Sequence, residues 1–516
     1  MDMNDYLQKI LRARVYDIAT ETPLERAQNL SKRLSNEIWL KREDLQPVFS
    51  FKIRGAYNKM VQLSKKELSI GVVTSSAGNH AQGVALSACQ LNCRAIIVMP
   101  NTTPATKVRA VNALKAEVIL HGQNYDEAHI EALRISKDKG LTFIHPFDDP
   151  EVIAGQGTIA HEILRQSKEK PDAIYVAVGG GGLIAGVSAY VKSLWPEIKV
   201  IGVEPLDADA MTRSLKEKKR IKLKEIGLFA DGVAVKEVGV HTFEIASKYV
   251  DSMVTVTNDE ICAAIKDVFE DTRSILEPAG ALAIAGMKSD IQKKKLQSKN
   301  LIAIACGANM NFDRLRFVAE RAELGEEREA MFAIEIPEKP GSLRNLCSVL
   351  GDRSLTEFSY RISDNSTAQI FIGVQILDSN DKINLIDAFN KSNINCLDLS
   401  NDELSKAHLR HMVGGRLPKF KKNQKESDIK ELLYRFEFPE LPGALMRFVE
   451  KLRPEWTISI FHYRNHGADI GRIVIGVLVP ENEIKNWSLF LSEIGYKNWD
   501  ESQNPAYKLF LGAEST

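Results

Sequence analysis

A lysine accompanied by several anion-binding segments is the feature of this sequence with the most chemical meaning. Lys52 lies in the stretch S-F-K-I-R-G-A, and an S-S-A-G-N-H segment, a run of four glycines and a C-G-A-N turn follow it. A lysine alone means little, because most lysines are solvated surface charges. Together with a loop for an anion and a glycine cradle for phosphate, it suggests a Schiff base to a phosphorylated aldehyde cofactor.

Lys52 is predicted to lie between a loop and the beginning of a helix. A lysine becomes a good nucleophile when desolvation or nearby positive potential lowers the pKa of its ammonium group. On the local sequence alone, a surface lysine beside Arg54 is the more common interpretation. The other motifs therefore decide whether Lys52 has a chemical role.

The segment Thr74–Gly83 follows a predicted strand and opens a predicted helix. Its small hydroxyl residues and glycine leave backbone N–H groups free at a helix N-terminus, which favours an anion such as a substrate carboxylate. Asn79 is suited to donate to an oxyanion on a cofactor ring. His80 has two interpretations, a general base or an ordinary hydrogen-bonded histidine, and the second is the more common.

Four consecutive glycines, Gly179–Gly182, follow another predicted strand and precede a helix. Because they lack Cβ atoms, their backbone amides can approach phosphate oxygens closely. The segment Gly180–Ala185 also matches G-x-G-x-x-A, and Glu204 follows the next strand, as in dinucleotide-binding proteins. The local pattern leaves monophosphate binding and dinucleotide binding equally open.

Two further side chains are candidates for the same site. Cys306 follows a predicted strand, where a thiol is either a nucleophile without an obvious histidine partner or a neutral partner for a heterocycle nitrogen. Glu277 precedes Pro278 at an expected helix start, because proline favours the first helical position. Helix capping and a role in the site are equally open for Glu277.

The elements that must position these residues read as an α/β region from about residue 20 to 320, in which apolar β-rich runs alternate with helical patterns. Nearly continuous apolar runs are typical of strands buried on both faces of a parallel sheet. Ligands bind at the ends of such strands in open α/β sheets. The predicted strands are Ile38–Lys41, Gly71–Thr74, Ala95–Met99, Val118–Leu120, Ala173–Val178, Val200–Val203, Met253–Val256 and Leu301–Ala305.

An internal repeat follows a charged stretch near residues 319–330. F-A-I-E-I-P-E-K-P-G-S-L, starting at Phe332, returns as Y-R-F-E-F-P-E-L-P-G-A-L, starting at Tyr434. Each copy shows an alternating strand, a Pro-Gly turn, a helix and two more strands, so the region is predicted to contain two similar subdomains. The Lys-rich stretch Lys419–Lys430 is interpreted as a solvated connector.

Composition excludes several classes of function. The 516 residues include 68 basic and 68 acidic ones, so the charge balance gives no reason to expect a nucleic-acid or membrane partner. No apolar run is long enough to span a bilayer, and no secretory signal is recognisable. The scattered cysteines indicate reduced thiols, and no metal site is expected. They are Cys89, Cys93, Cys262, Cys306, Cys347 and Cys396.

In combination, these motifs resemble the biosynthetic threonine dehydratases, a fold-type II pyridoxal-phosphate family with C-terminal ACT-like regulatory domains. The resemblance covers nearly the whole chain and also includes E-P-A-G-A-L-A at 277–283 and C-G-A-N-M-N-F-D-R-L-R at 306–316. It implies an α/β catalytic region of two open α/β subdomains, followed by two α+β subdomains. The implied boundaries are 1–325 for the catalytic domain, 326–405 and 431–516 for the regulatory subdomains, and 406–430 for a connector.

The resemblance also implies site residues. Lys52 becomes the lysine that forms the Schiff base with pyridoxal 5′-phosphate, Asn79 contacts the ring hydroxyl oxygen, and Cys306 stands at the pyridine nitrogen, where many relatives have serine. The 5′-phosphate is assigned to Gly179, Gly180, Gly181, Gly182 and Leu183. The substrate carboxylate is assigned to Ser75, Ser76, Ala77, Gly78, Asn79 and His80, with Glu277 behind the residues that touch the cofactor.

The activity that the resemblance implies is β-elimination and deamination of L-threonine, and also L-serine, to a 2-oxo acid and ammonia. Related serine racemases carry a second serine where this chain has Ala77, which favours elimination over racemisation. For threonine, the product 2-oxobutanoate leads into isoleucine biosynthesis, and the family is inhibited by isoleucine, an effect that valine opposes. A cytoplasmic homotetramer is the family expectation.

Three alternatives remain beside this interpretation. A serine-preferring dehydratase differs only in relative kcat/KM for the two substrates. An NAD-dependent dehydrogenase depends on the dinucleotide pattern, namely Gly180, Gly182, Ala185 and Glu204. A non-catalytic amino-acid sensor depends on the ACT-like repeat alone.

Overall fold

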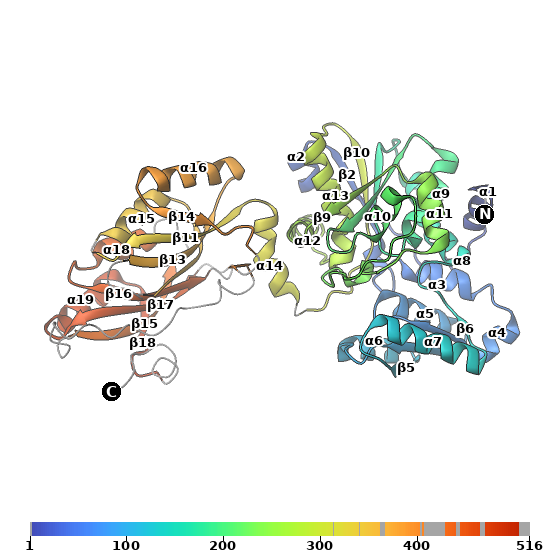
Figure 1. The fold of residues 1–516 in the computed structure, drawn as a ribbon, viewed down its shortest axis with the longest axis horizontal. Coiled ribbons are helices and arrows are strands. Elements are labelled where there is room, and N and C mark those ends of the chain that lie inside the picture. Colours follow the sequence, from blue (N-terminus) through green and yellow to red (C-terminus); the bar gives the residue numbers. More distant parts are fainter. Residues whose placement is uncertain are drawn as a thin grey trace. The chain divides into compact units, whose positions relative to one another are not determined.

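The computed structural model describes residues 3–312, 314–339, 341–361, 367–402, 405–406, 429–439, 444–464 and 470–504. The chain divides into two compact units, Met1–Gly325 and Glu326–Thr516 (Figure 1). Each unit has its own sheets and its own hydrophobic core. That is the organisation expected of two separate domains.

The larger sheet of the first unit has six strands in the order β1-β2-β10-β7-β8-β9. β1 pairs antiparallel with β2, and the other neighbouring pairs are parallel. β7 and β10 are buried along nearly their whole length, which explains their continuous apolar sequences. The strands are β1 (Leu24–Arg26), β2 (Glu37–Arg42), β7 (Ala173–Ala177), β8 (Lys199–Pro205), β9 (Ser252–Val256) and β10 (Asn300–Ala305).

The smaller sheet of the first unit is formed by the chain between β2 and β7. Its four strands are parallel in the order β5-β4-β3-β6. Helices connect the strands, as parallel pairing requires. The strands are β3 (Val72–Ser75), β4 (Ala95–Met99), β5 (Glu117–Leu120) and β6 (Thr142–Phe143).

Some helices of the first unit begin at side chains that cap them. Asn124 and Asp149 accept hydrogen bonds from the first turns of α7 and α8, and Thr257 forms a capping box with Glu260 at α12. No helix that the structure describes is both long and apolar enough to cross a membrane. The helices are α1 (Met3–Leu11), α2 (Gln28–Leu34), η1 (Glu43–Leu45), α3 (Lys52–Met60), α4 (Lys65–Ile70), α5 (Asn79–Gln90), α6 (Ala105–Ala113), α7 (Tyr125–Lys139), α8 (Pro150–Gln166), α9 (Gly182–Leu194), α10 (Ala210–Glu217), η2 (Asp231–Val233), α11 (Val240–Tyr249), α12 (Asn258–Thr272), α13 (Pro278–Lys294) and α14 (Arg314–Gly325).

All the strands predicted from apolar runs in this unit are confirmed, with ends that differ by no more than two residues. The sequence interpretation missed β1 and β6. Their sequences, L-E-R and T-F, are too short to show a periodic apolar pattern. The two missed strands form edges of the two sheets, so the arrangement of the remaining strands is as expected.

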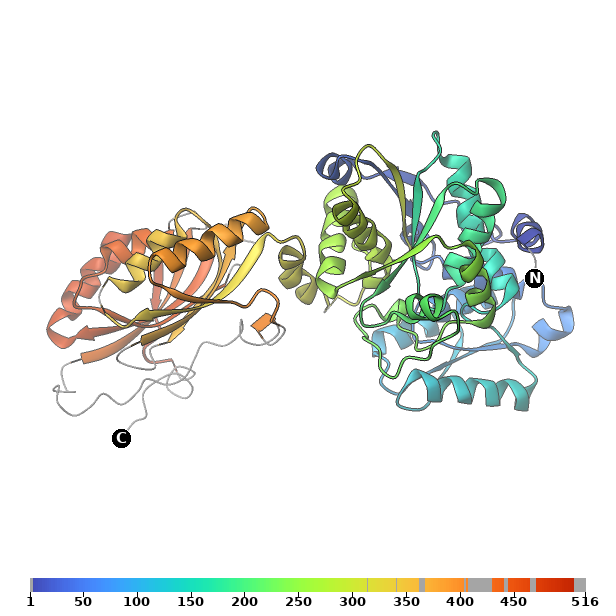
Figure 2. The same ribbon diagram turned by 45° about the horizontal axis from the view of Figure 1, so that its top comes forward.

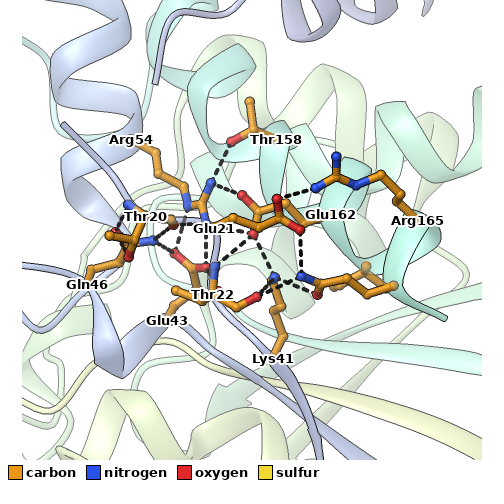
Figure 3. A network of polar contacts seen from close by, with 12 residues as sticks. Thr20, Glu21, Thr22, Lys41, Glu43, Gln46, Arg54, Thr158, Glu162 and Arg165 are labelled. Carbon is orange, nitrogen blue, oxygen red and sulfur yellow. Dashed lines mark hydrogen bonds and ion pairs between the residues drawn. The ribbon is translucent and has the colours of Figure 1, made fainter. Parts of the chain in front are cut away.

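A buried network of charges contacts α3 at Arg54, two residues after Lys52 (Figure 3). The Arg54 guanidinium contacts Glu43 Oε1 at 2.7 Å and Glu162 Oε1 at 2.6 Å, and Lys41 Nζ lies 2.6 Å from Glu162 Oε2. All these side chains are fully buried, and the cations and carboxylates balance. The network therefore fixes α3 against β2, η1 and α8. Removal of any one of these charged groups would leave an uncompensated buried charge.

The second unit contains one eight-stranded sheet in the order β14-β11-β13-β12-β16-β17-β15-β18. Apart from the short 3-10 helix η5 (Glu481–Glu483) before α19, its strands and α-helices whose bounds the structure describes fall into two series with the same order, strand, helix, two strands, helix and strand, which confirms the repeat. The first series is β11 (Glu329–Pro337), α15 (Ser342–Leu350), β12 (Leu355–Arg361), β13 (Thr367–Gln375), α16 (Ser379–Lys391) and β14 (Asn395–Asp398). The second is β15 (Ile429–Pro439), α18 (Ala444–Lys451), β16 (Thr457–Arg464), β17 (Ile470–Pro480), α19 (Ile484–Ile494) and β18 (Lys497–Asp500).

The two copies join edge to edge. β12 pairs antiparallel with β16, and the rings of Phe358 and Phe461 meet across the join with centroids 5.0 Å apart. The helices of both copies lie on one face of the common sheet (Figure 2). Residues of both copies belong to one core, so the repeat forms a single folded body.

Each copy contains a matching hydrogen bond over a glycine of its central strand. In the first copy, the Thr356 hydroxyl donates to the Glu329 carboxylate, at a point where the register of β12 shifts. A Cβ at Gly373 of β13 would lie 2.3 Å from Thr356 Oγ1, so the glycine makes room for the pair. The second copy repeats the arrangement with Ser459, Glu431 and Gly476.

The predicted Pro-Gly turns are described only in part. Gly341 precedes α15 with a φ of 90°, a conformation that favours glycine. Pro340 and the second pair, Pro442-Gly443, lie outside the described residues, as does the part of the predicted connector from 407 to 428.

Candidate active site

The sequence-predicted site residues follow the carboxyl ends of parallel strands in both sheets of the first unit. The segment after β3 leads into α5, the glycine run after β7 leads into α9, and Cys306 follows β10. Ser50, two residues before Lys52, forms an isolated antiparallel bridge with Gly307, and Phe51 N donates to Cys306 O at 3.2 Å. The lysine segment is thereby fixed to the end of β10, as expected for a site in an open α/β sheet.

Lys52 is the first residue of α3, and its side chain is half-buried. Its Nζ donates to Pro146 O at 2.9 Å. Burial lowers the pKa of Lys52 to about 8, although the nearby Cys306 and Glu277 act in the opposite direction. A fraction of the amine is therefore neutral near neutral pH, which is the state that a nucleophile or base needs.

The segment from Ser75 to His80 forms the turn between β3 and α5. Ser75 is buried, and its hydroxyl has no hydrogen-bond partner among the described residues. Ser76, Ala77, Gly78 and Asn79 are half-buried, so this turn is within reach of solvent in an otherwise buried region. The first N–H groups of α5 have no acceptor within the helix, which makes the turn suitable for a carboxylate.

His80 is an ordinary hydrogen-bonded histidine, the more common of its two interpretations. Its ring is buried, and Nε2 donates to Ile144 O at 3.0 Å. Burial lowers the pKa of His80 to about 3, so the imidazole is neutral at physiological pH. Nε2 is therefore already used, and the backbone N–H of His80 is a donor that a ligand at this turn can use.

The glycine run between β7 and α9 is packed so closely that larger residues would collide with their neighbours. A Cβ at Gly180 would lie 2.3 Å from the Phe147 ring, and one at Gly179 would lie 2.8 Å from Val233 Cα. Gly181 has a φ of 96°, which also favours glycine. Gly182 begins α9, and Leu183 follows it with a buried side chain, so Leu183 offers only its backbone to a ligand.

The dinucleotide interpretation of these glycines fails at its acidic residue. Glu204 is buried, and its carboxylate accepts hydrogen bonds from Met211 N and Thr212 N, each at 2.8 Å. It also accepts from the Thr212 hydroxyl at 2.7 Å. Glu204 therefore stabilises the first turn of α10 and is not available to bind a ribose.

Cys306 and Glu277 are both buried beside the lysine segment. The Cys306 thiol donates to Ala279 O at 3.2 Å, and burial raises its pKa, so the thiol is neutral. Glu277 precedes α13 without capping it, because its carboxylate accepts instead from Asn79 Nδ2 at 2.5 Å. The structure thus favours the site role over the capping role for Glu277.

Residues 144–148, between β6 and α8, connect the lysine to the glycine run. Pro146 accepts the Lys52 hydrogen bond, and Phe147 packs against the glycines. Asp148 accepts from the backbone of Val240, His241 and Thr242 at the start of α11. Thr242 Oγ1 in turn donates to Gly180 O at 2.6 Å, so the two parts of the site are joined by a continuous set of contacts.

Two ion pairs link the smaller sheet's helices to the segment 231–236. Lys107 Nζ of α6 lies 2.6 Å from Asp231 Oδ2, and Lys236 Nζ lies 2.9 Å from Asp126 Oδ2 of α7. Gly232 and Val233 of the same segment pack against the site. These ion pairs therefore connect the two halves of the first unit next to the candidate site.

Sequence reasoning missed several members of the site, including Pro146, Phe147, Asp148 and Asn309. Asn309 belongs to the quoted C-G-A-N motif but received no role. The segment H-P-F-D-D at 145–149 comes after β6, which is too short to be predicted. The segment was therefore not recognised as one that follows a strand. The available signal was its cluster of a proline, an aromatic residue and two acids between two expected elements.

The side chains present fit pyridoxal 5′-phosphate. Lys52 offers an amine that is neutral in part, Ser75 and the α5 turn offer donors, and the glycine run offers backbone amides at a helix start. Among the residues that the structure describes, no group of three or more His, Cys, Asp or Glu side chains is arranged to hold a metal ion.

Comparison with known proteins gives matches over both units. A family model described as pyridoxal-phosphate dependent enzyme matches residues 15–307. A model described as the C-terminal regulatory domain of threonine dehydratase matches residues 320–409 and 424–511. Together these models span most of the sequence.

Individual relatives align along almost the whole chain. Biosynthetic L-threonine dehydratase of Burkholderia multivorans is 55% identical over 514 residues, covering 99% of this chain and 100% of that protein. The corresponding Escherichia coli protein is 47% identical over 508 residues, covering 98% and 97%. The mitochondrial threonine dehydratase of Schizosaccharomyces pombe is 51% identical over 512 residues, covering 98% and 84%.

Solved structures similar to this one cover a smaller share of the chain. The processed form of threonine deaminase isoform 2 from Solanum lycopersicum has a TM-score of 0.61 and 54% identity, covering 62% of this chain and 93% of that one. Maize serine racemase has a TM-score of 0.57 and 31% identity, covering 61% and 96%.

Proposed function

The chain belongs to the threonine dehydratase family of pyridoxal-phosphate-dependent enzymes, and we propose that it converts L-threonine to 2-oxobutanoate and ammonia. The observation that carries the proposal is the half-buried Lys52 amine, fixed beside the end of β10 and connected to the glycine run. Pyridoxal 5′-phosphate, when bound, supplies an aldehyde that links to amines and a ring that withdraws electrons from the bond to be broken.

We assign Lys52 two tasks. It would hold the cofactor through its amine, and it would take the proton from Cα of the substrate. Its partial desolvation supports both tasks, because the pKa of about 8 leaves neutral amine near neutral pH. Gly179–Leu183 would hold the 5′-phosphate, and the Asn79 amide would donate to the ring hydroxyl oxygen.

The substrate carboxylate is assigned to the turn Ser75–His80 at the start of α5. The unpartnered Ser75 hydroxyl and the free first N–H groups of the helix support this assignment. Ala77, in the same turn, has no side chain that can move a proton. A base on the face opposite Lys52 is therefore missing at this position, which favours elimination over racemisation.

Cys306 is assigned to the pyridine nitrogen. Burial raises the pKa of its thiol, so it offers a neutral hydrogen-bonding group and neither a charge nor a nucleophile. A ring nitrogen beside a neutral partner would stay unprotonated. The ring would then withdraw less negative charge from the substrate carbon than a ring with a protonated nitrogen. Prompt loss of the β-hydroxyl group then competes well against other fates of the deprotonated substrate.

For the second unit we propose regulation by amino acids, with isoleucine as inhibitor and valine as its antagonist. The supports are the match to a regulatory domain and the two copies of one strand–helix pattern. We assign the catalytic domain to residues 1–325 and the regulatory subdomains to 326–405 and 431–516, joined by a connector at 406–430 whose last two residues already belong to β15. A homotetramer and a cytoplasmic location complete the proposal, and light scattering and cell fractionation test them.

One set of assays tests the function. 2-Oxobutanoate formation from L-threonine is measured with and without isoleucine, and kcat/KM is compared for threonine and serine. Borohydride reduction followed by peptide mass spectrometry should locate the pyridoxyl group on Lys52. Absence of turnover with both substrates, or a pyridoxyl group on another peptide, would contradict the proposal.

A further inference from the structure

The Asn79 amide is held at both of its ends by other side chains. Asn309 Nδ2 donates to Asn79 Oδ1 at 2.7 Å, and Asn79 Nδ2 donates to Glu277 Oε1 at 2.5 Å. Asn309 Nδ2 also donates to Val48 O at 2.8 Å. The result is a chain of hydrogen bonds that runs from the segment before Lys52, through two amides, to a buried carboxylate.

The donors and acceptors around the two amide groups determine the orientation of each amide. The Val48 carbonyl can only accept, so the Asn309 NH₂ group must face it, and the same NH₂ group then faces Asn79. The Asn79 end nearest Asn309 must therefore be its carbonyl oxygen. The opposite end is the NH₂ group, which meets the carboxylate of Glu277, an acceptor when ionised.

Only one hydrogen of the Asn79 NH₂ group is used by Glu277, so one N–H remains to donate elsewhere. Asn79 is half-buried, which places it at the accessible part of the site. If the amide turned over, a carbonyl oxygen would occupy the position of the donor and would repel an anionic oxygen. The orientation of this amide therefore determines whether the site attracts or repels an oxyanion.

The surroundings of Glu277 leave its carboxylate little freedom. A Cβ at Gly307 would lie 2.4 Å from Glu277 Oε1, and one at Gly232 would lie 3.9 Å from both Asn79 Nδ2 and Glu277 Oε1. Glu277 is only 5% exposed. Its carboxylate is thus confined next to Asn79, although the residue directly precedes α13 and could have capped it.

We propose that Asn309 and Glu277 are positioning residues that keep the Asn79 amide turned so that one N–H can donate to the ring oxyanion of the cofactor. This inference depends on the proposed function, which assigns that contact to Asn79. Neither residue needs to touch the cofactor. Both act through Asn79, and this dependence can be measured.

A double-mutant cycle on cofactor affinity tests the dependence on Asn79. Apoenzymes of Asn79→Ala, Asn309→Ala and the double variant are titrated with pyridoxal 5′-phosphate. We expect Asn79→Ala to weaken binding about tenfold or more, and Asn309→Ala about three- to tenfold. The double variant should bind about as weakly as Asn79→Ala alone, because Asn309 has nothing to orient once Asn79 is removed.

The outcomes separate the inference from the function on which it depends. If the effects of Asn79→Ala and Asn309→Ala multiply, Asn309 acts independently of Asn79 and the inference is wrong. If Asn79→Ala changes neither affinity nor the absorption spectrum of the bound cofactor, the assignment of Asn79 itself fails. Asn36→Ala is the control, because Asn36 is a buried amide that accepts from Lys299 N away from the site.

Variants of Glu277 provide a second arm, which applies even if Asn309→Ala does not fold. Glu277→Gln keeps an oxygen that can accept from Asn79, whereas Glu277→Ala does not. At a pH above the pKa of Lys52, we expect Glu277→Gln to retain cofactor affinity within about threefold and Glu277→Ala to lose about tenfold. Equal losses in both variants would show that charge, and not orientation of the amide, is what Glu277 provides.

Discussion

The two units of this chain use buried polar groups in opposite ways. In the first unit, each group of the candidate site occurs once, and Lys52, Asn79, Glu277 and Cys306 come from different elements. In the second unit, a partly buried carboxylate–hydroxyl pair occurs twice, over Gly373 and again over Gly476. A site built from single groups has no substitute for any member, whereas a repeated contact can lose one copy and keep the other.

This difference predicts where substitutions act. Changes in the first unit should affect the chemical step or the stability of that unit alone. Changes in the second unit should leave basal turnover intact and alter the response to an effector. A change in one copy should alter part of that response, and changes in both copies should alter it further. Substitutions at matched positions of the two units test whether their effects differ in this way.

The largest effect is expected for Lys52→Ala. Removing the amine takes away both the attachment of the cofactor and the base, so turnover should fall by at least about 10³-fold. Borohydride should leave no pyridoxyl group on the chain. Isoleucine binding to the second unit, measured by calorimetry, should persist. Lys52→Arg should be equally inactive, since arginine does not lose its proton, and an active arginine variant would contradict the assignment.

Arg54→Met should destabilise the first unit strongly. It leaves Glu43 and Glu162 buried with only Lys41 as a counter-charge, and breaking such pairs costs about 3–5 kcal/mol. Hydrogen exchange of first-unit peptides in increasing urea measures the loss. Second-unit peptides should exchange as before.

The matched control for Arg54 is Arg134→Met. Arg134 also pairs with two carboxylates, those of Glu131 and Asp138, but it is exposed on α7. Exposed pairs contribute little to stability, so this variant should unfold like the original protein. A loss as large as that of Arg54→Met would show that burial is not the reason for the effect.

The pH dependence of cofactor attachment should change in Glu277→Gln. Burial lowers the pKa of Lys52 to about 8, and the nearby Cys306 and Glu277 partly oppose this. A negative charge favours the ammonium form, so removing that of Glu277 should lower the pKa further. The rate at which apoenzyme takes up pyridoxal phosphate should rise with pH around a midpoint near 8 in the original protein, and around a lower midpoint in the variant.

Other charged groups around Glu277 also influence the pKa of its carboxyl group, and therefore the expected shift in the midpoint. Burial raises the pKa of Glu277 to about 7, and the charged groups that act on it are Asp231, Lys107 and Arg314. Lys107→Met therefore serves as a comparison, since it removes a charge near Glu277 without touching Asn79. An unchanged midpoint in Glu277→Gln would mean that the carboxylate is already neutral when Lys52 titrates.

In the second unit, Thr356→Val and Ser459→Ala should each remove about 1 kcal/mol of stability. The lost interactions are the hydrogen bonds to Glu329 and Glu431. Basal turnover should not change, whereas the isoleucine concentration for half-inhibition should shift. Equal shifts would show that the copies contribute alike, and a shift in only one variant would show that the repeat has one working copy.

The smallest effect is expected for Cys306→Ser. The hydroxyl can replace the thiol as donor to Ala279 O, and both groups are neutral. Turnover should stay within about threefold, a difference that a shorter, stronger hydrogen bond can account for. A complete loss of activity would indicate a chemical role for the thiol that its burial does not suggest.

The strands, and the segments that the fold brings together around Lys52, could be predicted because most of their signals are local. Apolar runs identified β7 and β10, and short motifs at strand ends marked Asn79 and Cys306, whereas Lys52 gained a role only in combination with those motifs. The sequence favoured an ordinary hydrogen-bonded His80, but it could not identify Ile144 O as its partner or decide the role of Glu277, because Ile144 and Asn79 are distant in sequence from the residues they contact. A sequence lists donors and acceptors, but only the fold selects their partners.

The pairing of β2 with β10 has a consequence for synthesis on the ribosome. Glu37 pairs with Asn300, so β2 stays without its parallel neighbour until nearly the whole first unit has been translated. Such distant pairings slow folding and leave apolar strands open to aggregation. Nascent chains halted before Asn300 should therefore depend on chaperones, and Lys52 should be fixed in place only at the end of that unit's synthesis.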